Sequence, residues 1–87
     1  MGAAPVVMYT KSWCPYCRRA RALLEQRGVQ FEEIDIEEQP QRRAEMIARS
    51  GRYTVPQIFI GNHHVGGSDD LHALEASGEL EPLLRAG

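Results

Sequence analysis

The apolar residues of the chain fall into two kinds of segment. Short runs rich in β-branched and aromatic side chains are typical of buried strands, whereas apolar residues that recur every three or four positions are typical of amphipathic helices. Strands are predicted at Pro5–Thr10, Phe31–Ile36, Gln57–Ile60 and His63–Val65. Helices are predicted from Pro15 to just before Gly28, at Gln41–Ser50, and from about Ser68 to just before Gly78. The order is therefore β-α-β-α-β-β-α, followed by a tail from Glu79 to Gly87 whose leucines are available for docking.

Single residues mark where the helices begin and end. Pro15 suits a first helical position, because its missing N–H would have had no partner there. Glycines follow the last helical turns, at positions 28, 51 and 78, where they are common. Ser68 is expected to cap the third helix. Asp69 and Asp70 then fall in its first turn, where the helix dipole favours negative charge.

The faces of the helices follow from the same spacing. The inward stripe of the first helix consists of Cys17, Ala20 and Leu24. The residues expected to face inward on the other two helices are Ala44, Ile47, Ala48, Leu71 and Leu74. The first two strands are joined by a helix and should be parallel with a right-handed crossover, whereas the last two should form an antiparallel hairpin. We therefore predict an α/β fold with a mixed four-stranded sheet and helices on both faces.

Composition and charge exclude several classes of function. A chain of 87 residues with 43% hydrophobic content is expected to form a single domain with a thin core. Its net charge of −2 does not suggest nucleic acid as a partner. The longest apolar runs fall far short of the roughly 20 residues that span a bilayer, and no secretory signal is visible at the N-terminus. We therefore expect a soluble, cytoplasmic and monomeric protein that binds neither nucleic acid nor membranes.

Both cysteines lie in the stretch SWCPYC, at the start of the first predicted helix. The unpaired N–H groups and the dipole at a helix N-terminus favour an anion, and the thiolate of Cys14 is such an anion. Lys11, three residues upstream, adds a positive charge. Cys17 lies one turn into the helix on the inward stripe, so it should be less exposed. We therefore expect Cys14 to be an exposed nucleophile and Cys17 to be the resolving thiol.

Two other interpretations of the cysteine pair rest on the same residues. In the first interpretation the thiols are ordinary core residues. Against it, C-x-x-C at the first helix of a βαβ unit is a specific redox signal. A structural zinc site would need four ligands, and the additional candidates are His63, His64 and His72. These histidines lie in or after the last hairpin, without a second C-x-x-C. We therefore expect no metal site, and interpret His63 and His64 as hairpin residues.

Three motifs together resemble the glutaredoxin family, in its dithiol class with Cys-Pro-Tyr-Cys. They are YTKSWCPYC at 9–17, TVPQIFIG at 54–61 and GGSDDL at 66–71, in family-like order and spacing. The likeness is to small bacterial glutaredoxins and covers nearly the whole chain. It implies a thioredoxin fold, a four-stranded mixed sheet flanked by three helices, for the single domain 1–87.

The resemblance also implies an activity. A glutaredoxin reduces protein disulfides and glutathione mixed disulfides, with glutathione as the cosubstrate and no bound cofactor. The chain has no Gly-rich dinucleotide loop. Reducing equivalents are therefore expected to arrive through glutathione reductase and the glutathione pool.

The site residues that the resemblance implies fall in two segments. In the first, the backbone of Val55 pairs with the cysteine of glutathione, and Pro56 is a cis proline. In the second, the γ-glutamyl end meets the start of the third helix, where Asp69 pairs with its ammonium group. The predicted set in these segments is Thr54, Val55, Pro56, Gly67, Ser68 and Asp69.

Side chains outside these segments complete the predicted glutathione site. Lys11 and Arg43 are expected to meet the glycyl carboxylate, with Arg42 as the alternative to Arg43, and Tyr16 to border the groove. Many relatives carry Cys where this chain has Ser68. The substitution removes a third thiol and leaves a hydroxyl, which suits a helix N-terminus.

Two other functions are kept as alternatives. A thioredoxin-like reductase served by a flavoprotein would agree with Trp13, but thioredoxins carry Trp-Cys-Gly-Pro-Cys, and Pro-Tyr departs from that pattern. An iron–sulfur carrier would hold a cluster between Cys14 of two subunits and two glutathiones. Cluster-binding relatives typically carry Cys-Gly-Phe-Ser, and Pro15 stiffens the loop and disfavours such a cluster.

Overall fold

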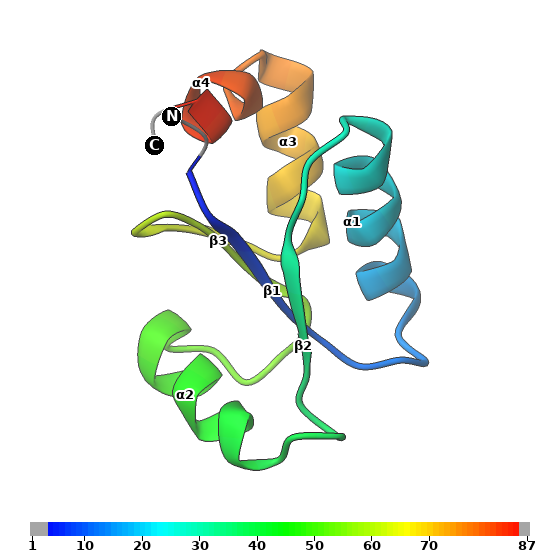
Figure 1. The fold of residues 1–87 in the computed structure, drawn as a ribbon, viewed down its shortest axis with the longest axis vertical. Coiled ribbons are helices and arrows are strands. Elements are labelled where there is room, and N and C mark those ends of the chain that lie inside the picture. The colour runs from blue at the N-terminus through cyan, green and yellow to red at the C-terminus, as the bar shows by residue number, and fades with distance from the viewer. Residues whose placement is uncertain (1–3, 86–87) are drawn as a thin grey trace.

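The computed structural model describes residues 4–85 as one four-stranded sheet with helices on both faces (Figure 1). Along the chain the elements are β1 (Val6–Thr10), α1 (Pro15–Gln26), β2 (Glu32–Asp35), α2 (Gln41–Ser50), β3 (Gln57–Ile60), β4 (His63–Gly66), α3 (Ser68–Ser77) and α4 (Leu80–Arg85). The strand order in the sheet is β2-β1-β3-β4.

The sheet is mixed, as expected. β1 runs parallel to β2, with Tyr9 opposite Ile34, and antiparallel to β3, with Tyr9 opposite Gln57. β3 and β4 form the predicted antiparallel hairpin, with an irregularity in register between Ile58 and Phe59. The carboxyl ends of β1 and β2 and the start of β3 therefore lie at the same end of the sheet, beside the start of α1.

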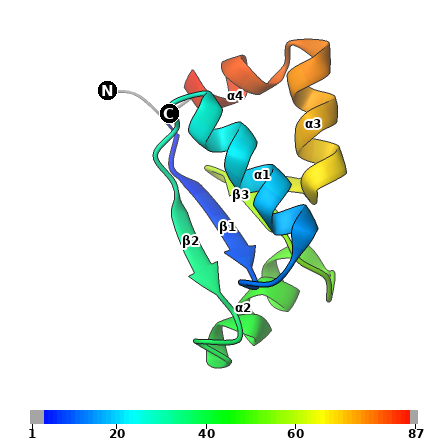
Figure 2. The same ribbon diagram turned by 90° about the vertical axis from the view of Figure 1, so that its right-hand side faces the viewer.

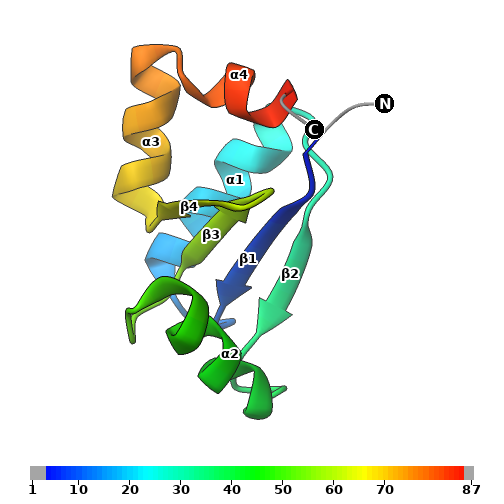
Figure 3. The same cartoon turned by 90° about the vertical axis from the view of Figure 1, so that its left-hand side faces the viewer.

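Two separate cores cover the two faces of the sheet (Figure 2 and Figure 3). Successive side chains of a strand point to opposite faces, so neighbouring residues of β1 divide between the cores. Met8 packs with α1 and α3, whereas Tyr9 packs beneath α2 with Ile34, Met46 and Phe59. The loops at the end of the sheet where β1 and β2 finish therefore lie between these two cores.

The inward face of α2 differs from the prediction. Ala44 and Ala48 are exposed, Ile47 is half-buried, and Met46 is fully buried. The reason is polar. The hydroxyl of the buried Tyr9 donates to the Glu45 carboxylate, and Arg49 on the same helix donates to that hydroxyl at 3.0 Å. A buried hydroxyl needs such partners, so the helix presents Glu45 and Met46 to the sheet in place of the two alanines.

The start of α3 also corrects a prediction. Gly67, not Ser68, is the N-cap, and Ser68 is the first residue of the helix, buried with 3% of its surface exposed. The carboxylate of Asp70 reaches back and accepts the N–H of Gly67 at 2.9 Å, as in a capping box. The ends of the helices are as expected, with Gly28, Gly51 and Gly78 following their last turns.

The tail folds as a fourth helix, so the sheet is flanked by four helices where three were expected. Leu80 is fully buried against α1 and α3, and Leu83 and Leu84 pack against the same core. The expectation that these leucines dock is confirmed. None of the helices within residues 4–85 is long and apolar enough to cross a membrane.

Candidate active site

The two cysteines occupy the loop between β1 and α1 and the first turn of that helix. Cys14 is the N-cap of α1, and its sulfur accepts the backbone N–H of Cys17 at 3.3 Å. The loop is closed by the N–H of Cys14, which donates to the carbonyl of Lys11 at 3.3 Å. The predicted placement of the sulfur at the helix N-terminus is confirmed. Hydrogen-bond donors and the helix dipole both favour negative charge there.

The two thiols differ in burial. Cys17 has 0% of its surface exposed and Cys14 has 5%, so Cys17 is the less exposed, as expected. The expectation that Cys14 is exposed is wrong, because its sulfur lies 3.9 Å from the carbonyl oxygen of Val55 and 3.3 Å from the backbone nitrogen of Cys17. Burial raises the pKa of Cys17 to about 11, partly offset by hydrogen bonding to Thr10 and Lys11. Cys17 is therefore a protonated thiol at neutral pH.

The loop from α2 to β3 brings a second segment to the cysteines. The Val55–Pro56 peptide bond is cis, which confirms the prediction for Pro56. Pro56 is buried, and Val55 is half-buried. The Val55 backbone therefore lies between the sulfur of Cys14 and the start of β3.

A groove of about 220 Å³ runs from this segment to the start of α3. It is lined by Tyr16, Arg52, Thr54, Val55, Pro56, Gln57, Gly67, Ser68, Asp69 and Asp70. The lining comes from three parts of the sequence, which the sheet topology brings together. All of the predicted glutathione-binding residues except Lys11 and Arg43 belong to it.

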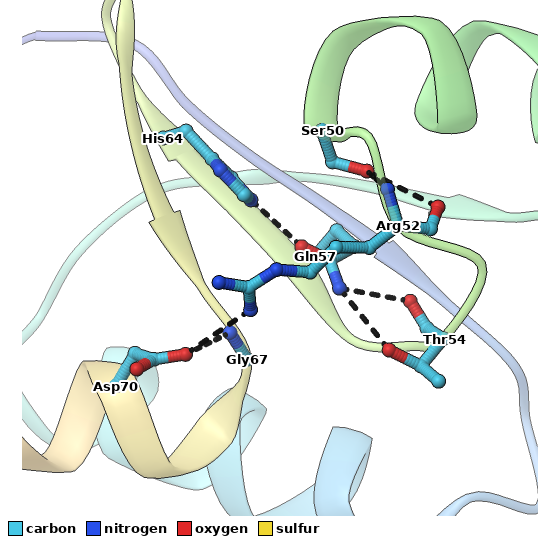
Figure 4. A network of polar contacts seen from close by, with 7 residues as sticks. All are labelled: Ser50, Arg52, Thr54, Gln57, His64, Gly67 and Asp70. Carbon is cyan, nitrogen blue, oxygen red and sulfur yellow. Dashed lines mark hydrogen bonds and ion pairs between the residues drawn. The ribbon is translucent and has the colours of Figure 1, made fainter.

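Two of the lining residues, Arg52 and Asp70, form an ion pair (Figure 4). Arg52, in the loop after α2, contacts the carboxylate of Asp70 at 3.5 Å. That carboxylate also holds the N–H of Gly67. Gly66 has a φ of 114°, which favours glycine, and a Cβ there would overlap the Asp70 carboxylate. The bend from β4 into α3 therefore depends on a residue without a side chain.

Trp13 directly precedes Cys14, is 61% exposed, and is not part of the groove lining. Its indole N–H donates to Glu37 at 2.9 Å, and the ammonium of Lys11 lies 5.3 Å from its ring centroid. Lys11 therefore stands near the cysteines but outside the lining of the groove. Arg43 is exposed on α2 and outside the lining too, whereas Arg42 is paired with Glu45 at 2.8 Å.

Comparison with known proteins identifies the family, because the glutaredoxin family model matches residues 6–65. The chain belongs to the glutaredoxin family. A glutaredoxin of Pseudomonas aeruginosa is 57% identical over 82 residues, which cover 94% of this chain and 98% of that relative. Membership in the family makes the chain a thiol–disulfide oxidoreductase.

Solved structures of glutaredoxins share the fold. The solution structure of the protein from Brucella melitensis has a TM-score of 0.86 at 55% identity, and the match covers 100% of this chain and 95% of the other. The crystal structure of a buckwheat glutaredoxin–glutathione complex has a TM-score of 0.84 at 32% identity, covering 93% and 76% of the two chains. The predicted thioredoxin fold is therefore confirmed.

Three lining residues were not predicted from the sequence as part of this glutaredoxin site: Arg52, Gln57 and Asp70. Gln57 was otherwise placed as the first residue of a strand, and Asp70 as a charge near a helix dipole. Both lie within motifs that carry the family resemblance, TVPQIFIG and GGSDDL, and this was the one available signal. Among residues 4–85, no group of three or more His, Cys, Asp or Glu side chains could hold a metal ion.

Proposed function

We propose that the chain is a glutathione-dependent oxidoreductase that reduces protein disulfides and glutathione mixed disulfides. The observation that carries this proposal is that the Val55–Pro56 segment and the first turn of α3 line one groove, with the Cys14 sulfur 3.9 Å from the carbonyl oxygen of Val55. The glutathione complex of the buckwheat relative, which shares the fold, supports it.

The proposed reaction begins at Cys14. Its thiolate attacks one sulfur of the substrate disulfide and forms a mixed disulfide, while the other sulfur leaves as a thiolate. With a protein substrate, Cys17 then attacks the sulfur of Cys14, loses its proton, and releases the second target thiol. The enzyme is left with a Cys14–Cys17 disulfide, having given two electrons to the substrate.

The environment of Cys17 fits the role of a second nucleophile. Burial is the main cause of its raised pKa, and the neighbouring Cys14 sulfur raises it further. Once Cys14 is in a mixed disulfide, its negative charge is gone, so this second contribution disappears. Cys17 therefore becomes easier to deprotonate at the stage when its attack is needed.

The groove offers complementary groups to glutathione. The backbone of Val55 would pair with the cysteine of the ligand, with Thr54, Pro56 and Tyr16 forming the walls. The N–H group of Ser68, in the first turn of α3, suits the α-carboxylate of the γ-glutamyl end, whereas the N–H of Gly67 is held by Asp70.

Charged side chains would hold the two ends of the tripeptide. Asp69 would pair with the ammonium group. Lys11 and Arg43 remain the predicted partners of the glycyl carboxylate. Arg52 lines the groove and contacts Asp70 in the first turn of α3, which is the proposed γ-glutamyl end. We place this reaction in the cytoplasm, where glutathione reductase would renew the reduced glutathione.

The test compares the single variants Cys14→Ser and Cys17→Ser. The assay follows reduction of a glutathione mixed disulfide with glutathione, NADPH and glutathione reductase. We expect Cys17→Ser to keep activity, because a second glutathione can release the mixed disulfide on Cys14, and Cys14→Ser to be inactive. Equal activity of the two variants, or faster turnover with thioredoxin reductase in place of glutathione, would contradict the proposal.

A further inference from the structure

The side chain of Gln57 is polar, yet only 1% of the residue's surface is exposed. It is the first residue of β3 and directly follows Pro56. The proposed reaction assigns it no role. Buried polar side chains normally have all of their hydrogen-bonding groups paired, so its partners indicate what it holds in place.

The amide of Gln57 connects two segments (Figure 4). Its nitrogen donates to the backbone carbonyl of Thr54 at 3.0 Å and contacts the Thr54 hydroxyl at 3.3 Å. Its oxygen lies 2.7 Å from Nε2 of His64. A carbonyl only accepts hydrogen bonds, so the NH₂ end must face Thr54. The oxygen must therefore face His64, whose Nε2 carries the proton that is donated to Gln57.

His64 is itself held in place. It lies on β4, half-buried, and its ring stacks on Phe59 with the centroids 4.8 Å apart and the planes at 27°. Burial, followed by the positive charge of Arg52, lowers the pKa of His64, so the ring is neutral at neutral pH. A fixed ring with one N–H is a directional donor, and it fixes the amide of Gln57 in one orientation.

The contact between Gln57 and Thr54 affects the groove through the peptide unit of Thr54 and Val55. The carbonyl of Thr54 and the N–H of Val55 belong to the same planar trans peptide and point in opposite directions. Holding the Thr54 carbonyl toward Gln57 therefore sets the direction of the Val55 N–H. Val55 lines the groove, and its carbonyl oxygen, which belongs to the next peptide unit, lies 3.9 Å from the Cys14 sulfur. The amide of Gln57 therefore orients the peptide unit that directly precedes this carbonyl.

We propose that Gln57 and His64 are positioning residues that orient the Thr54–Val55 peptide for the backbone of the ligand. This inference rests on the proposed function, since the ligand is taken to be glutathione. Neither residue touches the reacting sulfur atoms. Their loss should weaken ligand binding and leave the chemistry of Cys14 intact.

The test replaces His64 by Ala and measures reduction of the mixed disulfide of glutathione and β-mercaptoethanol. We expect KM to rise by roughly threefold to tenfold, the effect of one hydrogen bond, with kcat changed by less than about twofold. His64→Gln offers an amide N–H at similar reach and should restore most of the affinity. His63→Ala is the matched control, because His63 is the exposed neighbour on the same strand and should leave both constants unchanged.

A second variant, Gln57→Met, has a side chain of similar volume that cannot hydrogen-bond to Thr54 or His64. It should raise KM in the same way. The ligand-free proteins are compared by NMR, where the Val55 amide resonance should shift in His64→Ala and Gln57→Met but not in His63→Ala. Unchanged KM and an unchanged Val55 resonance in both variants would overturn the proposal, as would a loss confined to kcat. If the wild type did not turn over glutathione, the proposed function would fail, and the Val55 resonance would still test the orientation of the peptide.

Discussion

Cys14 and Cys17 are separated by a single helical turn, yet the surroundings of their sulfurs differ. The Cys14 sulfur accepts a backbone N–H at the start of α1, which stabilises a negative charge. The Cys17 sulfur is fully buried and its pKa is raised to about 11. Position within one turn of helix is therefore enough to divide the roles of two identical side chains.

This difference predicts selective alkylation. Iodoacetamide should modify Cys14 of the reduced, folded protein at neutral pH and leave Cys17 unmodified. With a pKa of about 11, Cys17 is a thiolate in only roughly one molecule in 10,000, and its reactivity should increase as the pH rises. Peptide mass spectrometry measures both sites, with urea-unfolded protein as the control in which both react. Equal labelling of the two cysteines in the folded protein would contradict the assignment.

At the scale of elements, α2 is attached to the sheet by a few apolar side chains and by polar contacts. Met46 is its one fully buried side chain, and the polar contacts of Glu45 and Arg49 with Tyr9 complete the attachment. The loop that follows α2 carries Arg52 and the Thr54–Val55 segment. The attachment of this helix therefore supports one wall of the groove.

Replacing Glu45 by Gln should lower the free energy of unfolding at neutral pH by up to about 1 kcal/mol. Hydrogen bonds from Arg42 and then Tyr9 lower the pKa of Glu45 from 4.5, so the folded state favours the carboxylate. This contribution is present above the unfolded pKa and is lost as the pH falls through the lower, folded value. Urea denaturation at neutral and acidic pH measures it, with Glu38→Gln as the exposed control. A stability difference that persisted undiminished at acidic pH would contradict the ionic origin.

Sequence patterns predicted the bounds of α2 and β3 because glycine and proline mark their ends, and failed on orientation within α2. The spacing of apolar residues placed Ala44 and Ala48 inward, but it contains no information about the hydroxyl of Tyr9, which requires Glu45 as a partner. Likewise, either Ser68 or Asp70 could accept a backbone N–H at the start of α3. The sequence does not show that Asp70 reaches the N–H of Gly67 while Ser68 is buried.

In the whole molecule, α4 lies at one end of the sheet and the starts of α1 and α3 point toward the other (Figure 2). The groove is lined by residues at this second end. Leu80 anchors α4 with none of its surface exposed. Its core joins β1, α1 and α3, and α1 and α3 are the two helices whose N-termini face the groove. The contacts with α4 and the groove therefore lie at opposite ends of the same two helices.

Leu80→Ala should therefore lower the free energy of unfolding by about 2–5 kcal/mol, a large share of what a small domain has. Where the protein remains folded, selective alkylation of Cys14 should persist, because the cavity forms far from the cysteines. Thermal denaturation and the alkylation assay test the two parts separately. Leu83→Ala, at a half-buried position, should lower the free energy of unfolding by less. A Leu80→Ala loss no larger than that of Leu83→Ala would contradict the anchoring role.

The composition of the groove was predictable only in part. The motifs around Cys14, Val55 and Ser68 are local in sequence, and the structure brings them together as expected. The hydrogen bond between Gln57 and His64 depends on the register of β3 and β4, which pairs Phe59 with His64. The sequence predicted the hairpin but not this register. The cation that lines the groove, Arg52, was missed for the same reason: its place depends on how the loop after α2 folds back toward α3.

Trp13 gives the molecule an optical reporter of its own chemistry. It is the single tryptophan of the chain and directly precedes Cys14. Its indole is exposed to solvent and held by Glu37. Closing a disulfide one residue away would change the quenching of its fluorescence. The redox state of the unlabelled protein could then be followed in real time from the emission of one residue.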